Sequence, residues 1–349
     1  MSFRHAVLAI AKLLGGFALA RVLTAKGLRI LCYHGISLQD EHCFQPKLFM
    51  QEDIFRQRMA HLKRHGYPVL PLSDALTLMY QESLPPRALV ITFDDGWLGV
   101  GLKAVPVLRE CGFPSTVYVT TQDVLEEAPV FNVALRYLLW KGSGKRLSMA
   151  LFDLGADTVA LDSAEIREQV AQRIGEAGIS KDTRNQLTLL KKLAEVLEAD
   201  WNPGDSRGFF RLMTMEQLEA LPKQGMDLQL HTHRHRLPVG DPVAMQSELV
   251  ENRAVLERIT AGALQHFCYP SGEFHPSQFS ALRALGIESA TTCLSGFNYA
   301  NTPRLELRRF LDGTNIAQVE FEAEVSGFLE LMRRVRERIH LNPGRTTGA

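Results

Sequence analysis

Four stretches of the chain repeat one pattern of hydrophobic and polar positions: apolar residues at helical spacing, then a glycine, then a short apolar run. They are residues 55–72, 105–121, 215–231 and 278–293. The glycine of each stretch is expected to end its helix in a left-handed conformation, at Gly66, Gly112, Gly225 and Gly286. Thr214 and Gln217 predict a capping box that starts the third helix. Helices that alternate with buried strands indicate a parallel sheet covered by helices.

Four apolar runs finish in polar residues. They are RILCY before His34, LVITF before Asp94-Asp95-Gly96, DLQL before His231-Thr232-His233, and HFCY before Pro270-Ser271-Gly272. Both a (β/α) barrel and a doubly wound open sheet fit this many units. Chemistry at the carboxyl ends of several strands favours the barrel. A doubly wound sheet would concentrate its ligand at one switch point, often with a glycine-rich phosphate loop. The chain contains neither GxGxxG nor GxxxxGK[ST], so we predict a barrel.

Three segments depart from this rhythm. Residues 123–213 have mostly helical spacing and are interpreted as an insertion on a barrel that spans residues 28–320, either a lid or a contact surface. Residues 321–349 predict a final helix, acidic first and basic last, followed by a tail.

Residues 1–27 predict an N-terminal helix with two open interpretations. Its apolar run is interrupted by Lys12, is followed by Arg21 and Lys26, and is shorter than the roughly 20 residues of a spanning helix. It lacks a convincing cleavage site, so a signal peptide is the minority interpretation. The helix either packs on the domain or lies on the cytoplasmic face of a membrane.

Composition narrows the class of protein. The 349 residues are 46% hydrophobic and 22% charged, which is ordinary for a globular chain with a large core. Lysine plus arginine and aspartate plus glutamate both number 39, so no basic excess points to nucleic acid as a partner. The five cysteines form no CxxC pair, which favours a reducing compartment. We therefore expect a cytoplasmic protein or one peripheral on the cytoplasmic membrane face, with a periplasmic location as the minority alternative.

The strand ends also carry the candidate chemistry. On a strand His231, His233 and His235 would share one face, whereas on a helical turn only His231 and His235 would. The following RLPVGDP favours a turn, so we select the 231/235 pair. Two histidines four apart and one carboxylate give a three-ligand site with an open position, as in catalytic zinc sites. One aspartate of the Asp94-Asp95 pair would ligate the metal and the other would deprotonate water. A solvated histidine loop and a helix N-cap are the alternatives.

The motifs TFDDG, HTxxH and YPxG, in this order, resemble those of the polysaccharide deacetylase (NodB-homology) family of carbohydrate esterases. The resemblance runs from about residue 28 to residue 315, apart from the insertion, and implies a distorted (β/α)7 barrel. It implies that Asp94 is the catalytic base and that Asp95, His231 and His235 bind zinc or a similar divalent ion. It also implies that the backbone N–H of Ser271 stabilises an oxyanion, and that the substrate is an N- or O-acetylated sugar, most often N-acetylhexosamine.

Two features depart from the family pattern. Many members carry an arginine where Cys268 stands; Arg309 is expected to replace it, with Arg308 as the alternative. The family's LxLHD segment supplies a histidine acid, whereas this chain has only FLDGTN near its C-terminus. The general acid therefore stays open between His34 and His233.

The resulting hypothesis is a hydrolase that removes acetyl groups from a sugar or polysaccharide with metal assistance. Four aromatic residues near the strand ends are candidates either for stacking on a sugar ring or for core packing: Tyr33, Trp97, Tyr269 and Phe274. Three alternatives stay open. They are a metal-free glycosidase with two carboxylates, a weak or inactive family member that binds saccharide, and a metal-dependent amidase or deformylase acting on a lipid-linked sugar.

Overall fold

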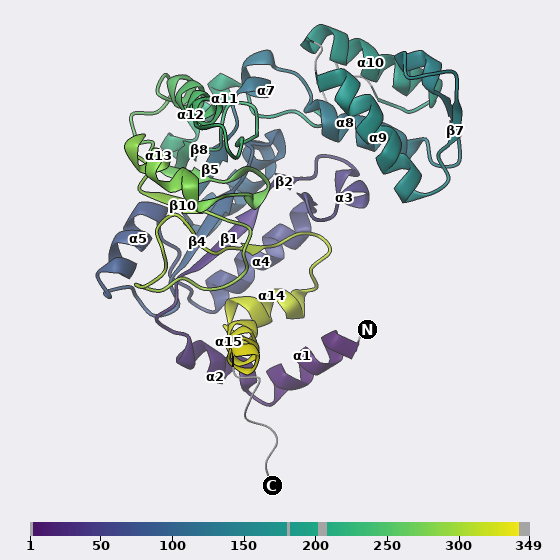
Figure 1. Ribbon diagram of the computed structural model, residues 1–349. Helices are drawn as coiled ribbons and strands as arrows, with labels where there is room; N and C mark the ends of the chain where they lie inside the picture. The colour runs from purple at the N-terminus through teal and green to yellow at the C-terminus, as the bar shows by residue number, and fades with distance from the viewer. Residues whose placement is uncertain (1–2, 180–181, 202–207, 342–349) are drawn as a thin grey trace.

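The centre of the protein is a sheet of seven parallel strands, seen in a computed structural model that describes residues 3–179, 182–201 and 208–341 (Figure 1). Across the sheet the strands are β10 (Ser289–Thr291), β9 (His266–Cys268), β8 (Met226–Leu230), β5 (Ser115–Val119), β4 (Leu89–Phe93), β1 (Arg29–Tyr33) and β11 (Phe310–Leu311). Neighbouring strands pair in parallel throughout. The predicted distorted barrel of seven parallel strands is confirmed.

One segment, residues 304–311, brings the two edges of the sheet together. Leu307 pairs in parallel with Thr291 of β10, and Phe310 pairs with Leu31 of β1. The segment therefore crosses from one edge strand to the other and closes the barrel. Its residue between these two pairings, Arg309, is completely buried.

The strands are buried because both of their faces are covered. Every residue of β1 and β4 is buried, as expected for continuous apolar runs in a parallel sheet. The outer layer consists of α4 (Glu52–Arg64), α5 (Leu72–Tyr80), α6 (Val105–Cys111), α11 (Met215–Ala220), α12 (Pro242–Leu256) and α13 (Phe279–Ala284). The four glycines predicted to end helices all have positive φ, between 61° and 83°. The Thr214–Gln217 capping box is also present.

The insertion forms a separate layer at the upper end of Figure 1. Its helices are α7 (Gln122–Glu126), α8 (Phe131–Lys141), α9 (Ala164–Ile179) and α10 (Thr183–Val196). An antiparallel hairpin, β6 (Arg146–Ser148) and β7 (Thr158–Ala160), was not predicted, because its strands have three residues each and only Leu147 is buried. Short pieces also cover this end of β1: β2 (Gly35–Ile36), α3 (Glu41–Phe44) and β3 (Phe49–Met50).

Both chain ends form helix pairs, and the prediction of one helix at each end is wrong. The N-terminal pair is α1 (Phe3–Leu13) and α2 (Gly16–Leu23), bent by 75° at Gly15, which has φ +80°. The C-terminal pair is α14 (Gln318–Val325) and α15 (Phe328–Leu341), broken at Gly327 with φ +86°, where a Cβ atom would clash with Thr24. Left-handed glycines end helices, which is why each run breaks there. The predicted tail, residues 342–349, lies outside the described residues.

No single helix of the described chain is long and apolar enough to cross a membrane, and only the bent pair α1–α2 passes that test of length and composition jointly.

Candidate metal centre and active site

Three side chains from two strand ends converge on one carboxylate oxygen. The Nε2 atoms of His231 and His235 both lie 3.2 Å from Oδ1 of Asp95. This Oδ1 atom is buried and accepts no hydrogen bond from a described residue. Leaving a buried carboxylate oxygen without a partner is costly. One carboxylate and two imidazoles around such an atom fit a divalent cation with an open coordination position.

The backbone at Asp95 separates the two adjacent carboxylates. Asp94 continues β4, where its N–H donates to the Tyr33 carbonyl at 2.9 Å. Asp95 then adopts φ +71°, a left-handed conformation that aspartate tolerates better than most residues. The chain turns there, so the Asp95 side chain points to the histidines and the Asp94 side chain does not. Trp97 donates its Nε1–H to the other Asp95 oxygen at 2.7 Å.

The ring of His231 is held from behind. Its Nδ1 lies 2.8 Å from the Cys268 carbonyl oxygen, and this hydrogen bond places the proton on Nδ1 and leaves Nε2 free to ligate. Its backbone N–H donates to Asn252 Oδ1 at 3.0 Å. The predicted turn follows, with positive φ at Thr232 and His235 that brings the two rings to a centroid distance of 4.9 Å. The His235 side chain is 44% exposed and therefore lies at the mouth of the site.

Asp94 is bound by an arginine rather than by the histidines. Arg309 donates from Nη1 to Oδ1 at 2.7 Å and from Nη2 to Oδ2 at 2.8 Å. Burial would raise the pKa of Asp94, but the charge and hydrogen bonds of Arg309 outweigh it, so the pKa lies well below its usual range. Asp94 is therefore an ionised carboxylate that already has a cation. Two thiols complete its surroundings, at 3.5 Å from Cys32 and 3.4 Å from Cys268.

The structure selects between the two arginine candidates. Arg309 also lies 3.2 Å from Cys268 Sγ, so its guanidinium occupies the space beside the cysteine. Arg308 points elsewhere: its backbone N–H donates to Asn298, and its guanidinium lies 3.8 Å from Glu337. Burial raises the pKa of Cys268, which keeps its thiol neutral next to the ion pair.

The two general-acid candidates lie in different surroundings. His34 Nε2 lies 3.8 Å from Asp94 Oδ2, and its side chain is 20% exposed. His233 turns away from the cluster: its Nδ1 bonds to Thr121 Oγ1 at 2.8 Å and its Nε2 lies 3.6 Å from Glu251. The geometry therefore favours His34 over His233 as a proton donor beside Asp94.

Ser271 follows β9 in a tight turn, Pro270–Gly272. It is exposed and has φ +57°. Gly272 has φ +72°, and a Cβ atom there would lie 2.6 Å from Cys293 Cβ, so the turn requires glycine. The turn starts two residues after Cys268, which contacts both His231 and Arg309, so Ser271 stands at the same strand end. Its role as an oxyanion donor stays a prediction.

The idea that four aromatic side chains stack on a sugar is wrong for three of them. Tyr33, Trp97 and Tyr269 are each at most 3% exposed. The Tyr33 hydroxyl donates to Asp312 and the Tyr269 hydroxyl to the Leu305 carbonyl. These rings belong to the core because the barrel closes over them. Phe274, stacked on Tyr269 at 5.1 Å, is partly exposed and is the one that stays available.

Sequence reasoning missed three supporting residues. Trp97 orients Asp95, Asn252 orients His231, and Cys32 packs beside Asp94. Trp97 is two residues from its partner and could have been noticed. Asn252 lies on α12, 21 residues from His231, and no local pattern indicates that contact.

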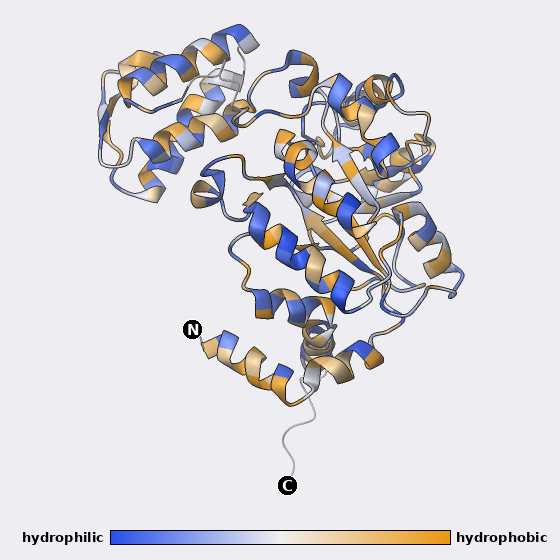
Figure 2. Cartoon of the chain, turned by 180° about the vertical axis from the view of Figure 1, so that it is seen from behind, coloured by the Kyte–Doolittle hydropathy of each residue, from blue (hydrophilic) through white to orange (hydrophobic). Residues whose placement is uncertain are grey.

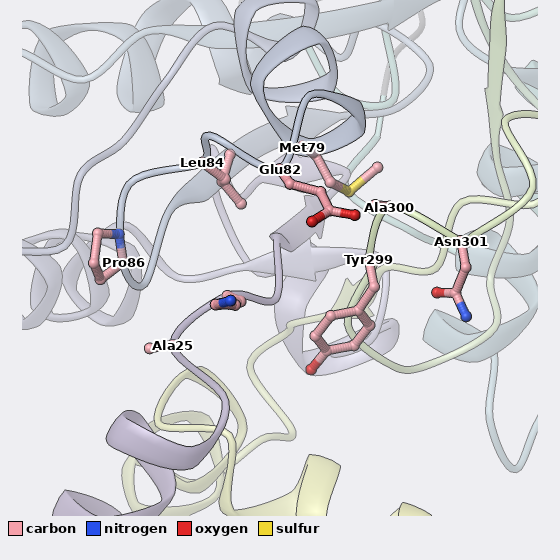
Figure 3. Close-up of a pocket in the computed structure, with 9 residues that line it drawn as sticks. Ala25, Met79, Glu82, Leu84, Pro86, Tyr299, Ala300 and Asn301 are labelled. Carbon is pink, nitrogen blue, oxygen red and sulfur yellow. The ribbon is translucent and has the colours of Figure 1, made fainter.

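A cavity of about 530 Å³ lies at the other end of the barrel (Figure 3). It is formed where the loops before β1, β4 and residues 304–311 meet, and its lining includes Lys26, Glu82 and Tyr299. None of the metal-site residues lines it, so it is separate from the candidate active site.

The sequence profile of the polysaccharide deacetylase family matches residues 81–290, which is more than half of the chain. The chain belongs to this family. A protein of Bacillus subtilis (strain 168), YxkH, named as a polysaccharide deacetylase, is 30% identical over 98 residues, or 28% of this chain. The match covers 33% of that protein, so the chain aligns with about a third of its length.

Two solved structures show the same fold. The deacetylase PplD of Streptococcus pyogenes, in complex with acetate, has a TM-score of 0.57 at 18% identity and covers 86% of this chain and 98% of its own. IcaB from Ammonifex degensii has a TM-score of 0.53 at 17% identity and covers 87% of this chain and 97% of its own. At these identities the likeness concerns the fold of the deacetylase barrel.

Proposed function

We propose that the protein is a metal-dependent hydrolase that removes acetyl groups, N-acetyl groups foremost, from a sugar or polysaccharide. The observation that carries this proposal is the convergence of His231 and His235 on one oxygen of Asp95, with Asp94 alongside and bound by Arg309 instead. Membership of the polysaccharide deacetylase family supports the same reaction.

Asp95, His231 and His235 would hold the metal. Two imidazoles and one carboxylate with an open position are a donor set typical of catalytic zinc, so zinc is the ion we propose. When bound, such an ion supplies Lewis acidity for the acetyl carbonyl and lowers the pKa of water. Trp97 and the Cys268 carbonyl fix the orientation of Asp95 and His231, respectively.

Asp94 is proposed as the general base. Arg309 keeps its carboxylate ionised and fixed in orientation, and each oxygen retains a lone pair for the proton of an attacking water. His34, 3.8 Å from Asp94, is proposed as the acid that protonates the departing amine. The Ser271 N–H is proposed to stabilise the oxyanion, as the family resemblance implies.

The geometry bears differently on the alternatives. A glycosidase needs two carboxylates about 5–10 Å apart across the sugar. Here the carboxylates are adjacent, one against an arginine and the other against two histidines. A saccharide-binding member without activity, or an amidase acting on a lipid-linked sugar, would use the same residues, so experiment has to distinguish them.

The test is metal analysis of the purified protein combined with acetate release. We expect one tightly bound divalent ion per chain and acetate release from N-acetylglucosamine oligomers that 1,10-phenanthroline abolishes and zinc restores. An O-acetylated xylan in parallel tests the ester alternative. Release of reducing sugar that survives the chelator would identify a glycosidase. Metal binding without acetate release from any acetylated substrate would contradict the proposal.

A further inference from the structure

The N-terminal helix pair exposes large apolar side chains to an unusual extent. Of the seventeen large hydrophobic residues that are exposed in the described chain, eight lie on α1, α2 or the turn between them: Phe3, Val7, Ile10, Leu13, Leu14, Leu19, Val22 and Leu23. Leu13 is 90% and Leu14 is 81% exposed. Figure 2 shows α1 as an apolar helix along most of its length. A surface helix normally has a polar outer face, so this surface calls for an occupant.

The pair is nevertheless firmly attached to the domain by its opposite face. Leu8 and Phe17 pack with Ala323 of α14 in a small buried cluster. Arg4 of α1 pairs with Glu320 at 3.1 Å, and Lys12 pairs with Glu322. The helices therefore have two apolar faces, one buried on α14 and α15 and one open to solvent.

The same surface carries positive charge. No acidic residue occurs before Asp40, whereas Arg4, Lys12, Arg21 and Lys26 lie on or next to the two helices. A cavity of about 490 Å³ between α1 and α15 is lined by Arg4, Arg333 and Arg336 together with Leu329 and Met332. Arg4 and Arg333 also pair with glutamates of α14 and α15, and Arg336 is exposed. Guanidinium groups beside apolar side chains suit a phosphate headgroup above its acyl chains.

We propose that α1, α2 and the outer face of α15 form a docking surface for an anionic lipid bilayer. The apolar side chains enter the headgroup–acyl boundary, and the cations contact anionic headgroups. The 75° bend and the burial of Leu8, Phe17 and Ala20 fit a pair lying on the surface rather than a straight spanning helix.

Figure 1 shows where this surface lies. Helices α1, α2 and α15 are at the lower end of the molecule, and α7 to α10 are at the upper end. Helix α2 leads into the amino end of β1, whereas the metal-site residues follow the carboxyl ends of β4 and β8. Changes to the docking surface are therefore separate from the proposed active site.

The experiment is flotation of the full-length protein with vesicles of pure phosphatidylcholine and with vesicles that also contain phosphatidylglycerol. We expect binding to the anionic vesicles, weakened by salt. The double variant Leu13→Glu/Leu14→Glu should bind more than about tenfold more weakly, since two fully exposed leucines no longer enter the lipid. Arg336→Gln should weaken binding about fivefold, the effect of one surface cation.

The matched control is Val196→Glu/Val250→Glu, which changes two exposed residues on α10 and α12 and should bind like the wild type. Circular dichroism checks the fold of each variant, and acetate release should be unchanged in Leu13→Glu/Leu14→Glu. Equal binding to both vesicle types, or undiminished binding by that variant, would overturn the proposal. Absence of vesicle binding together with an oligomer that the variant dissociates would assign the surface to a second copy and also overturn it.

Discussion

Arg309 donates two hydrogen bonds, of 2.7 and 2.8 Å, to Asp94 across the seam that closes the barrel. Asp94 follows β4, Arg309 precedes β11, and β1 lies between these strands in the sheet. Cys268, at the position where many members of the family carry an arginine, lies 3.4 Å from Asp94 and 3.2 Å from Arg309. The smaller cysteine leaves the space that a guanidinium from the other strand fills.

Replacing Arg309 should therefore damage both stability and activity. Arg309→Met leaves the Asp94 carboxylate buried without its cation, which costs about 3–5 kcal/mol of unfolding free energy. Loss of the charge also raises the pKa of Asp94 and reduces the ionised base. Urea unfolding and kcat/KM for acetate release measure the two effects. Arg308→Met is the matched control and should change unfolding by less than about 0.5 kcal/mol. Equal effects of the two variants would refute the assignment.

Asp94→Asn should separate metal binding from activity. The three proposed ligands do not include Asp94, so the metal content should stay at the wild-type value. Without its general base the enzyme should lose roughly 10²–10⁴-fold in kcat. Full deacetylase activity in a metal-replete, folded variant would show that the base lies elsewhere.

His235→Ala should lose the metal and the activity together, because it removes one of three ligands at a half-exposed position whose truncation leaves the core intact. His233→Ala is the control from the same loop. His233 bonds to Thr121 and Glu251 outside the cluster, so that variant should keep its metal. Metal analysis after gel filtration distinguishes them, and metal loss by both variants would make the site a property of the whole loop.

Trp97→Phe tests the support behind the metal site. Phenylalanine keeps an aromatic ring against Phe49, 5.0 Å away between centroids, but lacks the N–H that bonds Asp95. We expect metal affinity to fall roughly 10- to 100-fold, measured by competition with a chelating dye. Trp140→Phe, on α8, should leave affinity unchanged. An unaltered affinity in Trp97→Phe would mean that this hydrogen bond does not orient the ligand.

His266 should make the fold sensitive to mild acid. Burial, and to a lesser degree the charge of Arg304, lowers its pKa from 6.5 to about 4, and its ring bonds Ser73 and Ser289. Between these two pH values the unfolded chain binds a proton that the folded chain does not, so stability falls as pH falls. The shift corresponds to about 3 kcal/mol at about 1.4 kcal/mol per pH unit.

Urea unfolding of wild type and His266→Gln between pH 7 and pH 4 measures this contribution. The variant should lose less stability over that range than the wild type. His275→Gln, which changes an exposed histidine, should follow the wild-type curve. Parallel curves for all three proteins would exclude His266 as the cause.

The sequence was most informative where signals are local. Buried strands read as apolar runs, so β1 and β4 could be located from RILCY and LVITF, and their polar ends marked the site. The choice of His231 and His235 rested on a turn signal only a few residues away, and the structure brings both rings to Asp95.

Contacts distant in the sequence were out of reach. The choice between His34 and His233 depends on which ring lies near Asp94, and only the folded barrel decides it. The breaks at Gly15 and Gly327 were missed because an isolated glycine is tolerated within a helical pattern. At Gly327 the reason for glycine is Thr24, about 300 residues earlier in the chain.

The position of α2 at the start of β1 has a geometric consequence for substrate supply. A five-residue strand measures about 17 Å, so a protein resting on lipid through α1 and α2 holds its catalytic mouth at least that far above the headgroups, opening toward water. A single sugar joined directly to a lipid would fall short of Asp94. A long glycan extending away from the bilayer would reach it, which selects polymers over short membrane-borne intermediates.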